Sequence, residues 1–166
     1  MPHESRTLTM ANRKSSYRTV RQRLDALLQP DTDWIAVMAT VACELHAAFD
    51  DFHWTGFYRV MDSKRLQVGP YQGGHGCIDI AIGRGVCGTA ARQKETMRLD
   101  DVNSFPGHIA CSATTMSEIV VPVMNRNGKL VAVLDVDSDR PAAFNGTDQS
   151  ELEAICSWIG RGWGPA

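Results

Sequence analysis

A pair of apolar runs joined by a short polar turn is the feature that most constrains how this chain can fold. The runs span residues 118–124 and 129–138, and Asn127 and Gly128 lie in the turn between them. An Asn-Gly pair in this position is typical of a β-hairpin, because both residues accept the positive φ angles of a tight turn. Both runs are apolar along most of their length, so we expect them to be the central strands of a sheet.

Apolar residues recur at helical spacing in three further segments. We predict helices over residues 15–28, from 32 or 33 to 49, and from 147 to about 159. Asp31 or Thr32 would be the N-cap of the second helix, and Thr147 with Glu151 would form a capping box at the third. The glycines that follow residue 159 would end the last helix.

Shorter patterns predict the remaining elements. Strands are expected at 54–60, 66–71, 77–82 and 96–99, and a glycine-rich loop enters a short helix at 83–92. Residues 100–117 have no periodicity, and an irregular stretch of this length inside a compact domain is usually a functional loop. The order of elements predicts an α+β domain with a central, mostly antiparallel sheet and helices packed on one face.

Composition and charge bound the class of protein. The chain has 166 residues and a net charge of −2, but six of its basic residues and no acidic residue lie between Ser5 and Leu24. We predict a basic, disordered arm over residues 1–13 and a single domain over 14–162; a transit peptide is an alternative interpretation of the arm. The rest of the chain, with 11 basic and 19 acidic residues, is poorly suited to nucleic acid, and no apolar run is long enough to span a membrane.

The five cysteines are too few for a secreted disulfide scaffold, and their number is odd. We therefore expect a reducing, cytoplasmic environment. Cys43 and Cys156 lie on apolar helical patterns and are expected to pack in the core. Cys77, Cys87 and Cys111 lie in predicted loops or at a strand edge, beside glycines, where a thiol pKa can be lowered and the thiolate can act as a nucleophile.

A zinc site is a weaker interpretation of the same region. Its ligands would be two histidines and three cysteines: His75, Cys77, Cys87, His108 and Cys111. The spacing contains no close Cys-x-x-Cys pair of the kind that zinc sites usually use, so we predict no metal.

Three carboxylates lie in the predicted hairpin. Asp135 and Asp137 are two residues apart on one strand and project from the same face, and Glu118 begins the partner strand. If they are buried together, they would raise one another's pKa or hold a cation, either an ammonium group or a metal ion. The alternative is that the two aspartates end their strand at a solvated edge.

Aromatic residues open the first predicted strand. Trp54 and Tyr58 share one face of that strand, and Phe57 takes the other. Such a pair can enclose a methyl or sulfonium-like group, although a core stripe is the commoner role. The glycine-rich segment 83–88 lacks both the P-loop and the dinucleotide pattern, so nucleotide binding is not expected.

Six motifs occur in an order that resembles one enzyme family. They are Trp54-Thr55-Gly56-Phe57-Tyr58, Gly69-Pro70-Tyr71-Gln72-Gly73, Gly83-Arg84-Gly85-Val86-Cys87-Gly88-Thr89-Ala90, Gly107-His108-Ile109-Ala110-Cys111, Ser117-Glu118-Ile119-Val120-Val121-Pro122 and Leu134-Asp135-Val136-Asp137-Ser138. Together they resemble the free methionine-(R)-sulfoxide reductases, which are single GAF-domain enzymes. The resemblance spans about residues 33–160 and implies a GAF fold, with helices behind the sheet and a ligand pocket in front of it.

The resemblance also implies a reaction. The substrate would be free L-methionine (R)-sulfoxide, and Cys111 would attack its sulfur and become a sulfenic acid. Cys77 would resolve that acid as a disulfide, and Cys87 would be a third, auxiliary cysteine. The substrate would contact two aromatic and three acidic side chains: Trp54, Tyr58, Glu118, Asp135 and Asp137.

A thioredoxin-like protein would then reduce the disulfide, and no cofactor would be needed. A homodimer is one possible oligomeric state. The alternative function is a non-catalytic GAF sensor of a small molecule or of redox state. A sensor has no need of both Cys77 and Cys111, so the reductase is favoured.

Overall fold

The predicted hairpin lies inside the sheet in the computed structural model, which describes residues 10–109 and 111–166. The elements are α1 (Met10–Leu27), α2 (Trp34–Ala48), β1 (Trp54–Val60), β2 (Arg65–Gln72), β3 (Asp79–Ala81), α3 (Gly85–Gln93), β4 (Met97–Leu99), a 3-10 turn at Val102–Ser104, β5 (Ser117–Met124), β6 (Leu130–Ser138) and α4 (Gly146–Trp163). The strands lie in the order β3-β2-β1-β6-β5-β4, and each neighbouring pair is antiparallel. Strand β6 is therefore paired on both of its edges.

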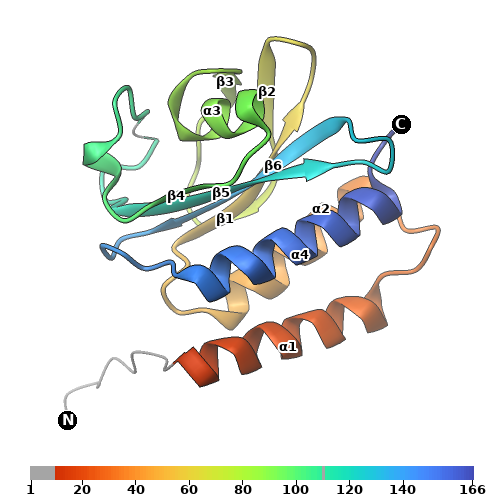
Figure 1. Ribbon diagram of the computed structural model, residues 1–166. Coiled ribbons are helices and arrows are strands. Elements are labelled where there is room, and N and C mark those ends of the chain that lie inside the picture. The colour runs from red at the N-terminus through yellow and green to blue at the C-terminus, as the bar shows by residue number, and fades with distance from the viewer. Residues whose placement is uncertain (1–9, 110) are drawn as a thin grey trace.

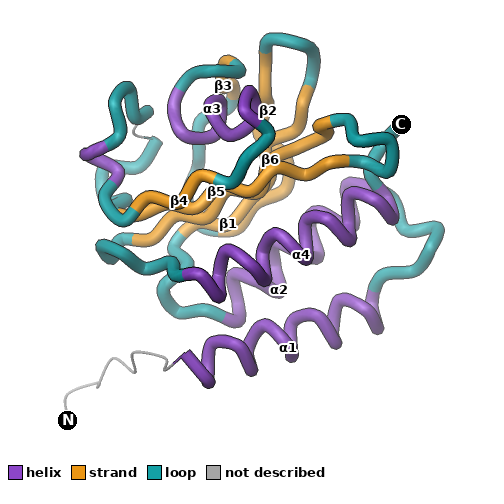
Figure 2. The backbone as a smooth tube through the Cα atoms, in the orientation of Figure 1, coloured by secondary structure: helices purple, strands orange, loops and turns teal. Residues whose placement is uncertain are grey.

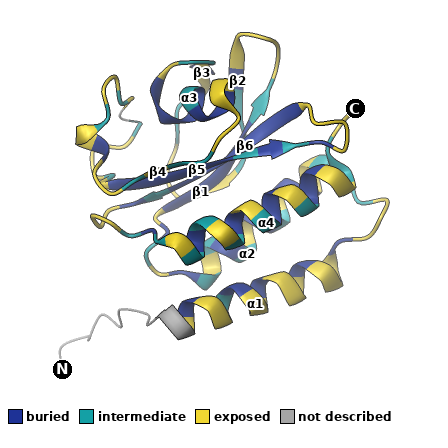
Figure 3. Ribbon diagram, viewed as in Figure 1, coloured by how far each residue is buried: buried dark blue, intermediate teal, exposed yellow. Residues whose placement is uncertain are grey.

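Helices α1, α2 and α4 lie on one side of the sheet, and α3 lies on the other (Figures 1 and 2). The larger apolar core fills the side that the three helices cover and includes Phe57 and Leu134. A smaller cluster under α3 includes Tyr58 and Val133. Figure 3 shows strands that are mostly buried and helices that are buried on one side only. This arrangement confirms the predicted α+β fold.

None of the described helices is both long and apolar enough to cross a bilayer.

Helix α1 begins at Met10, within the segment predicted to be a disordered arm. The cause is Arg13, which is buried and binds two carboxylates. Its Nε lies 2.6 Å from Asp148 Oδ1, and its Nη1 lies 3.0 Å from Asp51 Oδ2. Tyr17 donates a hydrogen bond to the same Asp148 oxygen at 2.7 Å. The arm prediction is therefore wrong from Met10 onward, and its first nine residues lie outside the described part of the chain.

Removal of the Arg13 guanidinium should destabilise the fold strongly. In an Arg13→Ala variant the fully buried Asp148 carboxylate loses its cationic partner, which costs about 3–5 kcal/mol in the free energy of unfolding. Urea denaturation followed by circular dichroism measures this loss. Arg21→Ala is the matched control, because Arg21 forms an exposed 3.5 Å pair with Glu151 that contributes at most about 1 kcal/mol. Equal losses in the two variants would contradict this role of Arg13.

The N-caps of α2 and α4 differ from the predicted residues. Asp33 is the N-cap of α2, and its carboxylate accepts a hydrogen bond from the backbone two residues later. Asn145 is the N-cap of α4, where its side chain accepts from the Asp148 backbone and its own N–H donates to the Asp148 carboxylate. The capping box predicted at Thr147 and Glu151 is therefore wrong, because Asn145 and Asp148 satisfy these backbone groups first.

The last helix continues past its predicted end. Gly160 and Gly162 lie inside α4, which ends at Trp163. A Cβ atom on Gly160 would collide with the carbonyl group of Met124. Glycine at this position lets α4 lie close against the end of β5 and does not end the helix.

Candidate functional site

The three carboxylates of the hairpin meet on the sheet face opposite α1, α2 and α4. Antiparallel register places Glu118 of β5 directly opposite Asp137 of β6, and Asp135 projects from the same face two residues away. Glu118 and Asp135 are each only 5% exposed. The alternative of a solvated strand end is wrong, because β6 pairs with both β1 and β5 along these residues.

Burial raises the pKa of each of the three carboxyl groups well above the ordinary value for that side chain. Repulsion within the cluster adds to this effect, since Asp137 raises the pKa of Glu118, Glu118 raises that of Asp135, and Asp135 raises that of Asp137. Asp135 Oδ1 is buried and has no hydrogen-bond partner among the described residues. The cluster therefore favours protonated forms and offers a free acceptor to a ligand.

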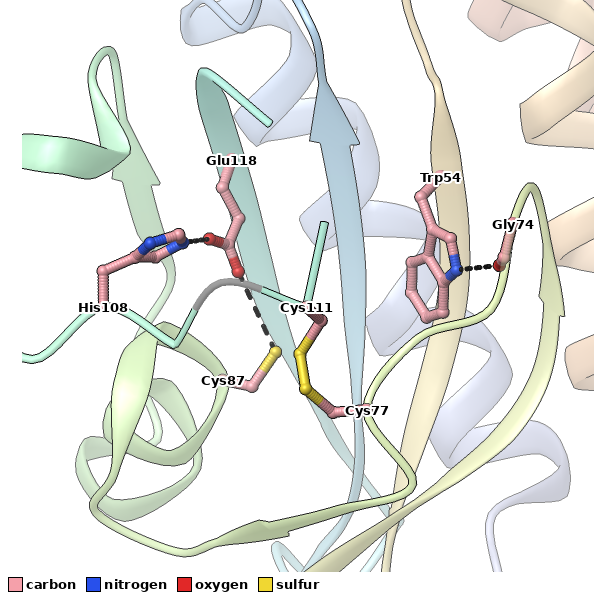
Figure 4. Close-up of a disulfide and its surroundings, with 7 residues drawn as sticks. All are labelled: Trp54, Gly74, Cys77, Cys87, His108, Cys111 and Glu118. Atoms are coloured by element: carbon pink, nitrogen blue, oxygen red, sulfur yellow. Dashed lines mark hydrogen bonds and ion pairs between the residues drawn. A yellow bond between two sulfur atoms is a disulfide. The ribbon is translucent and has the colours of Figure 1, made fainter. Parts of the chain in front are cut away.

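A disulfide joins Cys77 and Cys111 beside this cluster (Figure 4). Their Cα atoms are 5.4 Å apart, although the two residues are separated by 34 positions in the sequence. Cys111 belongs to the long loop before β5, and Cys77 belongs to the segment between β2 and β3. Strand β3 begins at Asp79 and is shorter than the predicted strand, which began at Cys77. The disulfide thus connects two loops at the front of the sheet.

Cys87 lies in the first turn of α3 and is 4% exposed. Its Sγ atom is 4.0 Å from Glu118 Oε1 (Figure 4). Burial, followed by the charges of Asp135 and Glu118, raises the pKa of the Cys87 thiol well above its ordinary value. The expected lowering of the thiol pKa is therefore wrong for Cys87, because carboxyl groups surround it and it stays protonated.

The two cysteines expected in the core have different environments. Cys156 is fully buried, as predicted. Cys43 is exposed, because it lies about 100° around α2 from Ala42 and about 200° from Val41, which belong to the buried face.

His108 contacts the carboxyl cluster, a contact that the sequence analysis did not predict. Its Nε2 atom lies 3.5 Å from Glu118 Oε2 (Figure 4). Burial lowers the pKa of His108 and raises that of Glu118. The neutral imidazole and the protonated carboxyl group are therefore both favoured, so the pair can share a hydrogen bond without a buried charge.

The five zinc ligands of the weaker interpretation do not come together among the described residues, because Cys77 and Cys111 are bonded to each other. The ligand atoms that do gather belong to Cys87, Glu118 and Asp135, and they all lie within 4.8 Å of one another. This buried, acidic set is suited to a cation, and an ammonium group is one such cation.

Trp54 and Tyr58 form an aromatic wall, with ring centroids 5.7 Å apart. Gly56 lies between them on the same face of β1, and a Cβ atom there would come within 2.6 Å of the Trp54 ring. Tyr71 of β2 pairs with Gly56, and its ring stacks on that of Trp54 with the ring centroids 5.3 Å apart. The sequence analysis did not name Tyr71 as part of the aromatic wall. Its position opposite a glycine in a predicted hairpin could have indicated this contact. Trp54 Nε1 donates a hydrogen bond to the Gly74 carbonyl at 2.9 Å, which orients the indole (Figure 4).

One pocket brings these groups together. Its lining includes the two aromatic rings, the three carboxyl groups, Cys87, His108 and Cys111, whereas Cys77 is not part of the lining. The pocket therefore combines a disulfide sulfur with several groups that can carry a proton and an apolar wall. Such an arrangement can bind a small molecule with a cationic end and reduce a group beside the sulfur.

The chain is similar to known proteins along nearly its whole length. A family model described as "GAF domain" matches residues 32–162. GAF domain-containing protein A of Dictyostelium discoideum is 39% identical over 92% of this chain and 95% of its own length. Free methionine-R-sulfoxide reductase of Escherichia coli is 36% identical over 89% of this chain and 88% of its own length. The X-ray structure of free methionine-R-sulfoxide reductase from Neisseria meningitidis in complex with its substrate superposes with a TM-score of 0.85 and 37% identity, covering 92% of this chain and 91% of that one.

Proposed function

This chain belongs to the GAF-domain family of free methionine-R-sulfoxide reductases, and from that premise we propose that its pocket reduces free L-methionine (R)-sulfoxide with Cys111 as the nucleophile. The protein is an oxidoreductase that acts on a sulfur group. The observation that carries the proposal is the Cys77–Cys111 disulfide beside three carboxyl groups whose pKa values are raised. With the disulfide reduced to its two thiols, such a site offers both the electrons and the protons that reduction of a sulfoxide consumes.

The buried carboxyl groups are suited to the charged end of a free amino acid. The substrate ammonium stabilises one carboxylate in its ionised form, and Asp135 Oδ1 is a free acceptor for it. Repulsion within the cluster then keeps a proton on a second carboxyl group. Methionine sulfoxide within a peptide has no ammonium group, so it would leave a buried carboxylate unpaired, and this cost gives selectivity for the free amino acid.

The aromatic wall is suited to the other end of the substrate. Trp54 and Tyr58 present apolar ring surface beside the carboxyl groups. The S-methyl group of the sulfoxide would lie against these rings while the sulfur faces Cys111. The pocket thus supports binding at both ends of one small molecule.

The chemistry proceeds in two steps. The Cys111 thiolate attacks the sulfoxide sulfur, and a protonated carboxyl group of the cluster donates a proton to the oxygen. The oxygen passes to Cys111 as methionine leaves, so the sulfoxide is reduced by two electrons to methionine and Cys111 is oxidised by two electrons to a sulfenic acid. The Cys77 thiol then attacks that sulfur, the hydroxyl leaves as water, and the disulfide of this structure forms.

The remaining parts of the proposal concern the surroundings of the enzyme. A thioredoxin-like protein restores the two thiols, in a reducing, cytoplasmic compartment where such proteins are kept reduced. A homodimer is compatible with the exposed outer surface of α1 (Figure 3). The alternative of a non-catalytic GAF sensor of a small molecule or of redox state is less favoured, because a ligand sensor needs no disulfide at its pocket and a redox sensor needs no carboxyl cluster beside its disulfide.

The test is an assay for free methionine with dithiothreitol and an equal mixture of the (R)- and (S)-sulfoxides of L-methionine. Because one sulfur stereoisomer is consumed, methionine formation should stop near half of the added sulfoxide, and the pure (S)-sulfoxide should give none. N-acetylmethionine sulfoxide, whose amino group carries no charge, is the matched control for the free ammonium and should react at least about 100-fold more slowly. Complete consumption of the mixed sulfoxides, or equal rates with the acetylated substrate, would refute the proposed specificity.

A further inference from the structure

The loop that carries Cys77 is rich in glycine. Four residues, Gly73-Gly74-His75-Gly76, connect the end of β2 to Cys77. Glycine has the widest backbone freedom of all residue types, so holding such a loop in one conformation costs more entropy than holding other sequences of this length. Contacts with the rest of the fold are therefore needed if Cys77 is to stay near Cys111.

The indole of Trp54 contacts this loop at two positions. Its Nε1 atom donates a hydrogen bond to the carbonyl of Gly74, three residues before Cys77, at 2.9 Å (Figure 4). A Cβ atom on Gly76 would lie only 3.0 Å from Cζ2 of the same indole, so the backbone of Gly76 lies directly against the ring. The ring thus supports the loop up to the residue before Cys77.

The chain that follows Cys77 is held by the sheet instead. The carbonyl of Ile78 accepts a hydrogen bond from the backbone N–H of Val68 in β2 at 2.9 Å, and β3 begins at Asp79. The freedom of Cys77 therefore depends mainly on the glycine-rich side of the loop, where Trp54 makes its contacts.

The indole is itself fixed relative to the sheet. Trp54 belongs to β1 and pairs with Asp137 of β6. Its ring stacks with those of Tyr71 and Tyr58, with centroids 5.3 Å and 5.7 Å apart, and the residue is only 7% exposed. A donor on a side chain that packing holds in one rotamer gives the loop a fixed point of attachment.

We propose that the Trp54 N–H is a positioning group for the second chemical step: by holding Gly74 it keeps Cys77 beside Cys111, where Cys77 resolves the sulfenic acid. The ring of Trp54 forms the pocket wall, so two parts of one side chain act in the two steps. This inference rests on the proposed function, because the sulfenic acid arises when Cys111 takes the oxygen of the sulfoxide. The second step is intramolecular, so its rate follows the effective concentration of Cys77 near Cys111, which falls when the loop samples other positions.

The resolving step needs no other reactant. Cys77 gives up its proton, and its sulfur forms a bond to Cys111 Sγ while the S–O bond of the sulfenic acid breaks. The hydroxyl group leaves with that proton as water. The sulfur of Cys77 is formally oxidised by one electron and that of Cys111 is reduced by one, and the product is the disulfide that joins the two residues in this structure.

Competition for the sulfenic acid tests this role of Trp54. Reduced protein, freed of reductant, is mixed with one equivalent of the (R)-sulfoxide and with dimedone, which reacts irreversibly with sulfenic acids. Mass spectrometry then gives the ratio of the dimedone adduct at Cys111 to the Cys77–Cys111 disulfide. In Trp54→Phe, which keeps an aromatic ring but lacks the donor, this ratio should rise about tenfold, the effect of losing one hydrogen bond. Both products come from the same sulfenic acid, so the ratio does not depend on how fast the variant reduces the sulfoxide.

Trp158→Phe is the matched control. Trp158 lies on α4, on the other side of the sheet, where its ring contacts Trp163, and its replacement should leave the ratio unchanged (Figure 1). Hydrogen peroxide in place of the sulfoxide forms the sulfenic acid even if Trp54→Phe no longer binds the substrate, so the ratio can be measured in either case. An unchanged ratio in Trp54→Phe overturns the proposed positioning role, even where methionine formation is slower. A wild-type chain that forms no methionine overturns the proposed function instead.

Discussion

Replacement of Cys111 by serine is expected to lower methionine formation by at least about three orders of magnitude, with dithiothreitol or with thioredoxin as the reductant. A serine hydroxyl stays protonated at neutral pH and cannot form the sulfenic acid that carries the oxygen away from the substrate. Chromatographic measurement of free methionine gives the rate, and circular dichroism shows whether the variant is folded. Cys43→Ser is the matched control, because Cys43 is an exposed free cysteine on α2, away from the pocket, and its rate should equal that of the wild type.

The Cys77→Ser variant separates attack from resolution. Cys111 should still reduce one equivalent of sulfoxide, but thioredoxin-driven turnover should stop because no disulfide forms. Dithiothreitol is small enough to reach the sulfenic acid, so part of the turnover with this reductant should remain. Full thioredoxin-driven turnover in Cys77→Ser would assign resolution to Cys87, whose burial and raised thiol pKa argue against a leading role.

The carboxyl cluster should have the second largest effect. Asp135→Asn keeps the shape of the side chain but removes its proton and its charge, and we expect kcat/KM to fall about 100- to 10,000-fold. A loss confined to KM would indicate that Asp135 binds the ammonium group, whereas a loss in kcat would indicate proton donation. Asp62→Asn is the control, because Asp62 is an exposed carboxylate in the turn between β1 and β2 and is not part of the pocket lining. Unchanged kinetics in Asp135→Asn, Glu118→Gln and Asp137→Asn alike would refute the role of the cluster.

The pH dependence follows from the direction of the pKa shifts. Burial raises the pKa of Glu118, Asp135 and Asp137 in the folded protein, so their protonated forms persist above the pH at which exposed carboxyl groups ionise. If one of them is the proton donor, activity should be present on the acidic side of the raised pKa and fall as the pH rises through it. The wild-type rate should show this alkaline decline, and the amide variant of the donor should lose it.

The same shifts link stability to pH. A carboxyl group with a raised pKa in the folded state contributes stability below the pKa of the unfolded chain and loses that contribution as the pH rises through the folded pKa. At alkaline pH, Asp135→Asn should therefore unfold at a higher urea concentration than the wild type, since the amide cannot ionise. A lower unfolding midpoint at every pH would contradict the account of a buried, repelling cluster.

Much of the site could be predicted from local patterns. An alternation of period two places Asp135 and Asp137 on one face whatever the rest of the chain does, and a hairpin turn at Asn127 and Gly128 brings Glu118 opposite them. The same rule puts Trp54 and Tyr58 on a common face. The structure confirms these predictions, which depend only on residues near one another in sequence.

Other features depend on neighbours far away in sequence. The start of α1 was missed because Arg13 is paired with Asp148, which lies 135 residues later. The caps of α4 moved because several residues near its start can cap a helix and only the packing of the chain selects one. The prediction of a buried Cys43 is wrong because helical periodicity shows where the buried face of a helix is centred but not how many positions wide it is.

By itself the sequence determined the hairpin, the shared face of its acids and the family, because strand periodicity and ordered motifs are local properties. Only the tertiary structure decided which cysteines are joined and which groups favour their protonated forms. Cys87 stands in a glycine-rich turn that favours a thiolate, yet the folded chain buries it against Glu118 and Asp135 and raises its pKa. Protonation depends on burial and on charges brought together across the sheet, and these arise only when distant segments pack.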